Sequence, residues 1–212
     1  MKIGITGGIG SGKSYVCRQL EKFGINVYDC DRAAKHLIRT SDTIRKELTE
    51  LIGPDTYNTD GTLNKKTVSS FLLASEENAK AINAIVHPAV AEDFKNSDKL
   101  WMECAILYES GFDKLVDKVI AVTAPLEIRI NRVMNRDHIS REKALEWMDR
   151  QWSQEKVSQK ADFIIVNDGT SNIDKQIKEI IYNLITKKEN VTDNFSYLGQ
   201  TGTLQVSFSG KE

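Results

Sequence analysis

The sequence is poor in the features that mark secreted, metal-stapled and membrane-spanning proteins. Only three of its 212 residues are cysteines. They lack C-x-x-C spacing, so we expect neither a disulfide framework nor a structural zinc site. No apolar run approaches the roughly eighteen residues of a membrane span, and the chain opens into a predicted strand rather than a basic and apolar leader. We therefore expect a cytoplasmic protein without membrane association.

Strong charge of one sign and metal-ligand motifs are also lacking. The formal net charge is −1, so no overall field attracts nucleic acid or an anionic membrane. The three histidines form no H-E-x-x-H motif or paired spacing, and we predict no zinc site.

The sequence does contain a glycine-rich loop after a short β-branched strand. Residues 3–14, IGITGGIGSGKS, fit the P-loop pattern G-x-x-x-x-G-K-[ST] between a predicted strand and a predicted helix. In such a loop the backbone amides surround phosphate oxygens, Lys13 reaches the β- and γ-phosphates, and the Ser14 hydroxyl binds Mg²⁺. The alternative is a surface turn that contains glycines by chance. We predict that a nucleotide is bound by Gly8, Gly10, Ser11, Gly12, Lys13, Ser14 and Tyr15.

Other classes of P-loop protein are disfavoured by motifs that are missing. There is no N-K-x-D guanine motif of a GTPase and no two-acid strand end of a large ATPase motor. The loop also lacks the G-x-G-x-x-G spacing of a dinucleotide-binding fold. A small kinase remains.

Two acidic residues follow the second predicted strand. Residues 25–31 alternate like a strand and end in Asp29 and Asp31, which would project to the same side. Ligands bind beyond the carboxyl ends of strands in an open parallel sheet, so both acids would lie beside the P-loop. We predict that Asp31 accepts the proton of an attacking hydroxyl. The alternative is that Asp31 caps a helix beginning at Arg32.

A mainly helical stretch separates the second and third strands. Residues 33–99 place apolar residues at helical spacing and contain no strand candidate. We expect an inserted helical subdomain at about residues 33–98, where small-molecule kinases commonly place an acceptor-binding lobe. His87 before Pro88 is, by itself, typical of a structural histidine at a helix kink.

The next strand and the helices after it carry further candidates. Residues 100–109 read as a buried strand ending in Glu109, where P-loop proteins place the acid that faces the metal, although the spacing does not assign it. Residues 126–160 read as a basic helical pair that closes as a lid over the transferring phosphoryl group. Arg136 and Arg150 are the candidate lid arginines. The alternative is a solvated helical pair of mixed charge.

These elements predict an α/β fold. We expect a parallel five-stranded sheet flanked by helices, of the kind found in nucleoside monophosphate kinases, with the helical insert and the helical lid described above. The sheet core comprises residues 1–32, 99–125 and 161–187 of a single kinase domain, and residues 188–212 form a poorly ordered tail.

The ordered set of motifs resembles the dephospho-CoA kinase family over residues 1 to about 187. The P-loop alone is generic, whereas the order and spacing of the whole set are specific. The matching pieces are the P-loop; Asp29-Cys30-Asp31 with Ala33, Ala34 and His36; His87-Pro88; residues 106–111; Arg136-Asp137 with Ser140; Gln151; and Ala161-Asp162 with residues 167–169. The chain departs from the family pattern at Ala105, where a proline is usual, and at Thr123, where an acid is common.

The resemblance implies ATP- and Mg²⁺-dependent phosphorylation of the ribose 3′-hydroxyl of dephospho-CoA, the last step of coenzyme A synthesis. It implies catalytic roles for Asp31, Lys13 and Arg136. The implied acceptor site comprises Asp31, His87, Glu109 and Arg150.

Two other functions stay open. One is a kinase for a different small acceptor, such as a nucleoside monophosphate or a hydroxylated metabolite, which the acidic pair and His87-Pro88 disfavour. The other is a non-catalytic nucleotide-sensing module, which the candidate base Asp31 disfavours.

Overall fold

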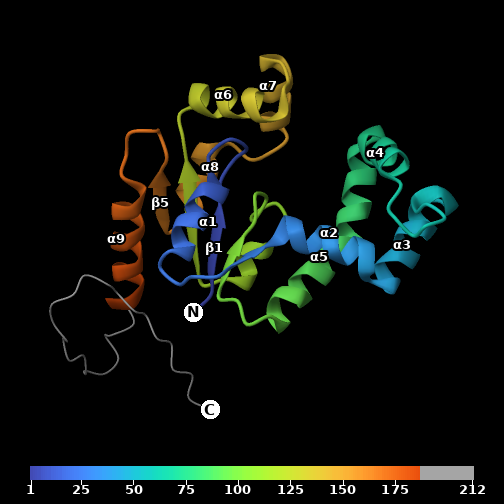
Figure 1. The fold of residues 1–212 in the computed structure, drawn as a ribbon, viewed down its shortest axis with the longest axis horizontal. Coiled ribbons are helices and arrows are strands. Elements are labelled where there is room, and N and C mark those ends of the chain that lie inside the picture. Colours follow the sequence, from blue (N-terminus) through green and yellow to red (C-terminus); the bar gives the residue numbers. More distant parts are fainter. Residues whose placement is uncertain (187–212) are drawn as a thin grey trace, which may run out of the picture. The chain divides into compact units, whose positions relative to one another are not determined.

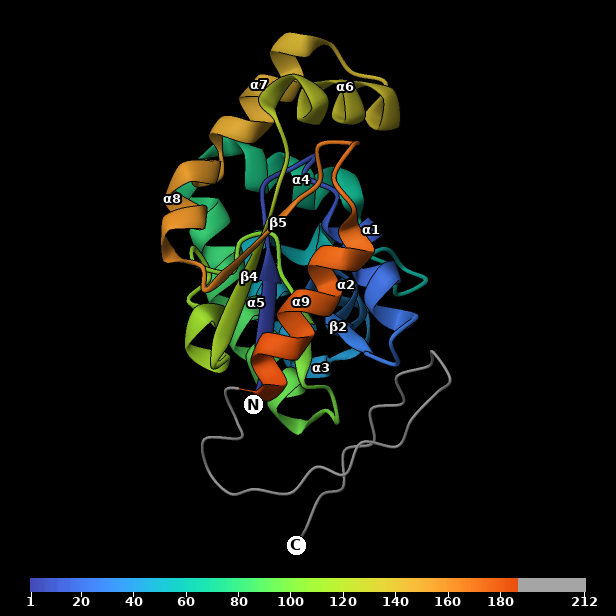
Figure 2. The ribbon, with the colours of Figure 1, turned by 90° about the vertical axis from the view of Figure 1, so that its left-hand side faces the viewer.

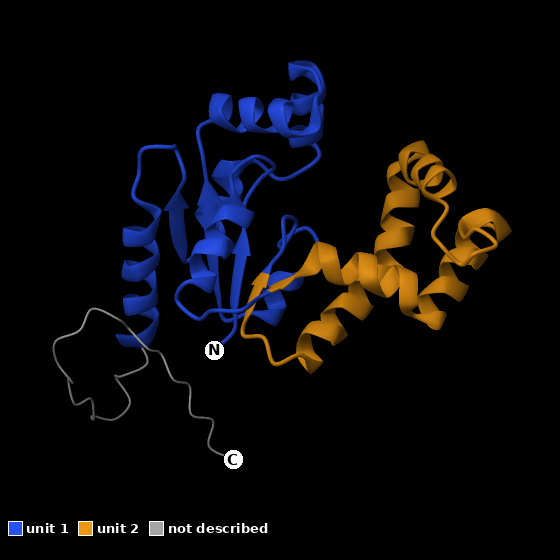
Figure 3. Cartoon of the chain, viewed as in Figure 1, with its two compact units in different colours: residues 1–27, 103–212 blue, residues 28–102 orange. Residues whose placement is uncertain are grey.

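The computed structural model describes residues 1–186 and divides into two compact units (Figures 1 and 3). The first unit comprises residues 1–27 and the chain from Glu103 onward, and the second comprises residues 28–102. The predicted tail, residues 188–212, lies outside the described residues.

Five strands form one parallel sheet in the order β2-β3-β1-β4-β5, which confirms the predicted α/β fold. In β1–β4 pairing, Ile3 lies opposite Lys118, and in β4–β5 pairing, Ile120 lies opposite Phe163. The strands are β1 (Ile3–Thr6), β2 (Val27–Asp29), β3 (Trp101–Glu103), β4 (Lys118–Thr123) and β5 (Phe163–Val166).

The helices of the first unit cover the sheet and form a hairpin beyond it. α8 packs on β4, and α9 packs on β5 and α1 (Figures 1 and 2). α9 buries one apolar face because its isoleucines and leucine recur at helical spacing, as the sequence predicts. α6 and α7 pack on each other through a buried cluster. The bounds are α1 (Lys13–Glu21), α6 (Leu126–Asp137), α7 (Arg141–Asp149), α8 (Gln154–Lys160), α9 (Ile173–Thr186) and a short 3-10 helix, η2 (Phe112–Leu115).

The second unit is mainly helical, as its sequence predicts. α2, α3 and α4 each pack against α5. Phe94 of α5 is fully buried, and its ring centroid lies 5.2 Å from that of Tyr28. α5 continues through His87 and Pro88. The bounds are α2 (Cys30–Thr40), α3 (Asp42–Ile52), η1 (Pro54–Thr56), α4 (Lys65–Ala74) and α5 (Glu76–Asn96).

The predicted arrangement of the acidic pair is wrong. β2 ends at Asp29, and Asp31 lies in the first turn of α2 instead of on an extended segment. Asp29 is the residue that caps the helix, since its Oδ1 accepts a hydrogen bond from the N–H of Arg32 at 2.8 Å. This cap satisfies a donor at the helix start and favours helix from Cys30 onward. Asp29 thus lies at the N-cap, before the helix, and Asp31 lies within the helix, so the two acids do not share one extended segment.

The predicted strand over residues 100–109 is also too long. β3 ends at Glu103, and the following residues form turns in which the N–H of Ser110 donates to the Ile106 carbonyl. Leu107 and Tyr108 are buried in these turns. A short apolar run can reach the core from turns as well as from a strand, and its sequence does not distinguish the two.

The sheet provides a matched test of burial. Ile120 on β4 is 1% exposed, whereas Ile164 on the neighbouring strand β5 is 46% exposed. Ile120→Ala removes fully buried methylene groups and leaves a cavity, so we expect unfolding free energy to fall by about 2 to 5 kcal/mol. Ile164→Ala should cost about 1 kcal/mol or less. Urea unfolding followed by tryptophan fluorescence measures both, and equal losses would contradict the assigned burial.

Candidate active site

The glycine loop connects β1 to α1 and needs glycine because other groups approach it closely. Gly12 precedes α1 with a φ of 92°, in the left-handed region. A Cβ at Gly12 would overlap the side-chain amide of Asn167, and a Cβ at Gly10 would overlap the backbone carbonyl of Arg129. Any larger residue would therefore displace α6 or the segment after β5.

Donors from α6 and from the end of β5 hold the carbonyl oxygens of this loop. Arg129 Nε donates to the Ile9 carbonyl at 2.9 Å, and Arg132 Nη1 lies 3.3 Å from the carbonyl oxygens of both Gly10 and Ser11. Asn167 Nδ2 donates to the Ser11 carbonyl at 2.9 Å. A trans peptide points its N–H opposite to its carbonyl, so these contacts turn the N–H groups of Gly10 and Gly12 the other way, whereas the Ser11 N–H donates to the Gly8 carbonyl at 3.1 Å. Such N–H groups at a helix start suit an anion.

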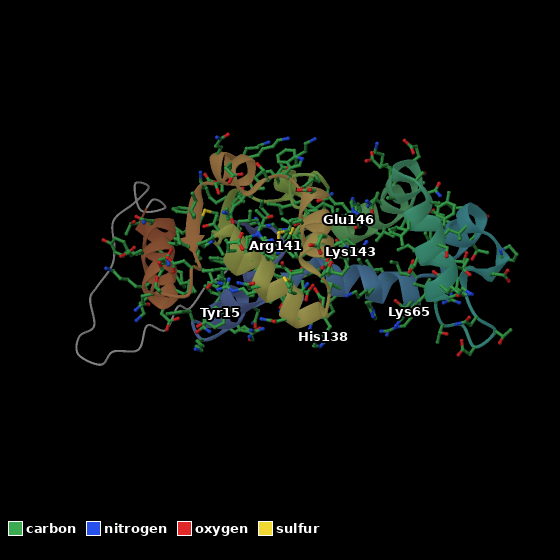
Figure 4. The ribbon with its side chains drawn as sticks, turned by 90° about the horizontal axis from the view of Figure 1, so that it is seen from above. Tyr15, Lys65, His138, Arg141, Lys143 and Glu146 are labelled. Carbon is green, nitrogen blue, oxygen red and sulfur yellow. The ribbon has the colours of Figure 1, made fainter. Side chains whose placement is uncertain are left out.

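Two side chains of the loop add to this picture. The buried Ser11 Oγ has no hydrogen-bond partner among the described residues, as fits a site completed by a ligand. Lys13 Nζ donates to the Gly7 carbonyl at 2.8 Å and lies 3.9 Å from Glu103 Oε1. Both charged side chains are largely buried, with 11% and 14% exposed. Tyr15, in the first turn of α1, is 44% exposed (Figure 4).

Sequence reasoning missed Glu103, which lies at the end of β3 and beside Lys13. Strand β3 runs next to β1, and the N–H of Cys104 donates to the Ile5 carbonyl at 3.0 Å. An acid at the carboxyl end of a strand adjoining the P-loop strand is the signal that could have found it. The signal was hidden because apolar residues continue beyond Glu103 as far as Tyr108, just before Glu109.

The structure pairs Glu109 with a different element. Glu109 is exposed, and its Oε1 accepts a hydrogen bond from the N–H of Trp152 at 2.9 Å. Trp152 lies between α7 and α8, and its ring stacks on Tyr108 with ring centroids 5.6 Å apart. Burial raises the pKa of Tyr108 to about 12. A role for Glu109 in acceptor binding stays a prediction.

The two arginines predicted for the lid are paired with acids near them in the chain. Arg136 Nη2 donates to Asp137 Oδ2 at 2.6 Å, which raises the pKa of Arg136 and lowers that of Asp137. Arg150 Nη2 donates to Glu146 Oε1 at 2.5 Å. Glu146 also accepts from Lys143 on α7 (Figure 4). Arg136, Arg150 and Glu146 are exposed and Asp137 is partly exposed, and ion pairs at the surface cost little to break.

Arg129 and Arg132, not Arg136, contact the glycine loop. The sequence places all three on one face of α6 but does not say which turn of the helix meets the loop. Burial lowers the pKa of Arg129, which is nearly inaccessible, and an arginine still keeps its charge at neutral pH.

Asp31 and His87 belong to the second unit. Asp31 is exposed in the first turn of α2, and His87 is half-buried on α5, the helix against which α2 packs. Burial lowers the pKa of His87, which favours its neutral form at pH 7. The roles predicted for both residues stay predictions.

Within residues 1–186, none of the helices is both long and apolar enough to cross a membrane. Nor do three or more His, Cys, Asp or Glu side chains of this part of the chain gather as a metal-ligand group.

Solved structures share the fold. A Thermus thermophilus protein superposes with a TM-score of 0.76 at 29% identity, over 87% of this chain and 97% of that one. Dephospho-CoA kinase from Campylobacter jejuni superposes with a TM-score of 0.62 at 22% identity, over 89% of this chain and all of that one. Shikimate kinase from Acinetobacter baumannii gives a TM-score of 0.52 at 16% identity, over 89% of this chain and 94% of that one. The last two likenesses concern the fold alone.

Sequence comparisons are more specific. A Bacteroides fragilis protein named dephospho-CoA kinase is 42% identical over 194 residues, which cover 88% of this chain and 94% of that protein. One of the same name from Porphyromonas gingivalis is 40% identical over 90% of this chain and 98% of its own length. The family model described as dephospho-CoA kinase matches residues 1–173. The chain therefore belongs to the dephospho-CoA kinase family.

Proposed function

We propose that the protein transfers the γ-phosphoryl group of ATP to the ribose 3′-hydroxyl of dephospho-CoA, giving CoA and ADP. Membership of the dephospho-CoA kinase family supports the donor and the acceptor. The observation that carries the proposal is the glycine loop. Arg129 and Asn167 bind the Ile9 and Ser11 carbonyl oxygens, and the N–H groups of Gly10 and Gly12 on the same peptides point the opposite way, where they suit a phosphate.

The residues of the chain have distinct roles in this proposal. The N–H groups of the glycine loop bind the phosphates of the donor, and Lys13 neutralises charge that develops during transfer. Asp31 accepts the proton of the acceptor hydroxyl. His87, Glu109 and Arg150 bind the acceptor, and Arg136 approaches the transferring group once its pair with Asp137 opens.

The residues near Lys13 fit a magnesium ion bound together with the nucleotide. Mg²⁺ prefers oxygen ligands and keeps several waters, so one or two protein oxygens and the substrate phosphates suffice. Ser14 would hold the ion directly, and the Glu103 carboxylate is the nearby group that could hold its waters. When bound, the ion neutralises charge on the β- and γ-phosphates.

The acceptor is tested by a panel. The purified protein is incubated with Mg²⁺-ATP and dephospho-CoA, nucleoside monophosphates or hydroxylated metabolites, and products are identified by mass spectrometry. We expect a phosphorylated product with dephospho-CoA. A product with another acceptor alone would indicate a different kinase. Bound ATP without any product would indicate a nucleotide-sensing module.

A cytoplasmic location is part of the proposal. No disulfide joins the three cysteines, all of which lie among the described residues, as fits a reducing compartment. We propose no nucleic-acid partner, because the net charge is −1.

Lys13→Ala tests the phosphate site. It removes the one ammonium group of the glycine loop, so we expect kcat to fall by roughly 10²- to 10³-fold and the Kd for ATP to rise. Lys22→Ala removes a charge at the opposite end of α1, so kcat and the Kd for ATP should each change by about twofold or less. Steady-state kinetics and calorimetric titration with ATP measure these effects, and unchanged ATP binding in the Lys13 variant would contradict the site.

Asp31→Asn tests the proposed base. It keeps the size of the side chain but removes its ability to accept a proton, so we expect phosphoryl transfer to fall by ~10² to 10⁴ with ATP affinity nearly unchanged. Asp29→Asn is the matched control, because asparagine caps a helix as well as aspartate does. Single-turnover rates of phosphoryl transfer, measured for both variants, compare the two aspartates. Wild-type turnover in the Asp31 variant would exclude this base.

A further inference from the structure

Ile9 joins the glycine loop to the base of the α6–α7 hairpin. Its N–H donates to Gln151 Oε1 at 2.8 Å, and its carbonyl accepts from Arg129 Nε at 2.9 Å. Gln151 follows α7 and Arg129 lies on α6, so both backbone groups of Ile9 are bound by the hairpin. The Ile9 side chain packs against the buried cluster between the two helices. This cluster comprises Ile130, Val133, Ala144 and Met148.

The segment that carries Gln151 is itself held in place. The N–H of Gln151 donates to the Met148 carbonyl at 3.1 Å, which continues the end of α7. The next residue, Trp152, donates its N–H to Glu109 and stacks its ring on Tyr108. Because these contacts fix the backbone, the Gln151 side chain reaches Ile9 from a rigid support.

The two bonds to Ile9 determine the direction of the next N–H group in the loop. The Ile9 carbonyl and the Gly10 N–H belong to one planar peptide, so their directions are tied together. Arg129 binds that carbonyl, and Gln151 binds the peptide before it. Only the φ and ψ angles of Ile9 separate these peptides, so the two bonds together restrain both angles. The direction of the Gly10 N–H therefore depends on Gln151 as well as on Arg129.

We propose that Gln151 is a positioning residue for phosphoryl transfer, which orients the Gly10 N–H of the glycine loop by binding the Ile9 N–H. This inference rests on the proposed kinase function. Gln151 acts through the loop and touches no reacting atom. The Gln151–Ile9 bond thereby couples the hairpin to the phosphate site.

Gln151→Met tests the proposal. Methionine keeps the length of the side chain but offers only a weak acceptor to the Ile9 N–H. We expect kcat/KM for ATP to fall by about 5- to 100-fold and the Kd for ATP to rise, as for a partly buried N–H left without its partner. The KM for dephospho-CoA should stay within about twofold.

Gln154→Met is the matched control. Gln154 Oε1 accepts a hydrogen bond from the Ala124 N–H at 3.0 Å, so it makes the same kind of bond three residues later, to the chain after β4. We expect its Tm to fall about as much as that of the Gln151 variant, because each change leaves one N–H unpaired. Its ATP kinetics should stay within about twofold of wild type. Equal kinetic losses in the two variants would show that Gln151 is merely structural and would overturn the proposal.

The other possible results of this experiment also test the role of Gln151. A folded Gln151→Met variant with wild-type ATP affinity and turnover would contradict the proposal. If that variant does not fold, Gln151→Asn replaces it, since its amide oxygen falls one methylene short of Ile9, and the same loss in ATP affinity is expected. Calorimetric titration with ATP in the absence of an acceptor tests the role of Gln151 independently of which acceptor the protein phosphorylates. If wild type binds ATP but does not phosphorylate dephospho-CoA, the proposed function fails while the affinities of the variants still test Gln151.

Discussion

The conformation of the glycine loop depends on the donors that bind its carbonyl oxygens. Arg129, Arg132 and Asn167 reach the loop from α6 and from the end of β5, more than a hundred residues away in the chain. A guanidinium group has several donors and no acceptor, and it stays charged when buried. It can therefore hold carbonyl oxygens of the loop while the N–H groups of Gly10 and Gly12, on the peptides of the bound Ile9 and Ser11 carbonyls, point away from it. The glycines follow from the same contacts, because a Cβ at Gly8, Gly10 or Gly12 would collide with these donors or with the backbone that carries them.

Lys13 illustrates how a charge is kept ready in this site. Its ammonium group is largely buried, yet the Gly7 carbonyl and the Glu103 carboxylate both lie near it. A buried charge without partners would be costly. A phosphate that binds in the loop replaces partners that Lys13 already has. The ammonium group is therefore already desolvated before the phosphate arrives.

The sequence predicted those parts of the structure that depend on local patterns. The P-loop motif lies in consecutive residues, and α9 follows from isoleucines at helical spacing. The helix after the glycine loop and the helix α9 were therefore both confirmed. The geometry of Asp29 and Asp31 was mispredicted because an aspartate that ends a strand and one that caps a helix look alike in sequence. Glu103 was missed because the apolar residues after it are buried in turns and resemble a continuing strand.

The contacts of Arg129 and Gln151 could not be predicted for another reason. Each joins positions at least 120 residues apart, and no local pattern encodes which turn of α6 or which residue after α7 meets the loop. The sequence supplied the correct helical face of basic residues but selected Arg136, one turn or more beyond the residues that bind the loop. Tertiary packing, here through the side chain of Ile9 in the hairpin core, decides that register.

The central claim is that this chain phosphorylates one hydroxyl of dephospho-CoA, and the position of the new phosphate tests it most directly. Two-dimensional ¹H–³¹P NMR of the purified product identifies the ribose proton that is coupled to the added phosphorus. The proposed function predicts coupling to the ribose H3′ proton. Coupling to H2′, or a product without a new ribose phosphate, would contradict it.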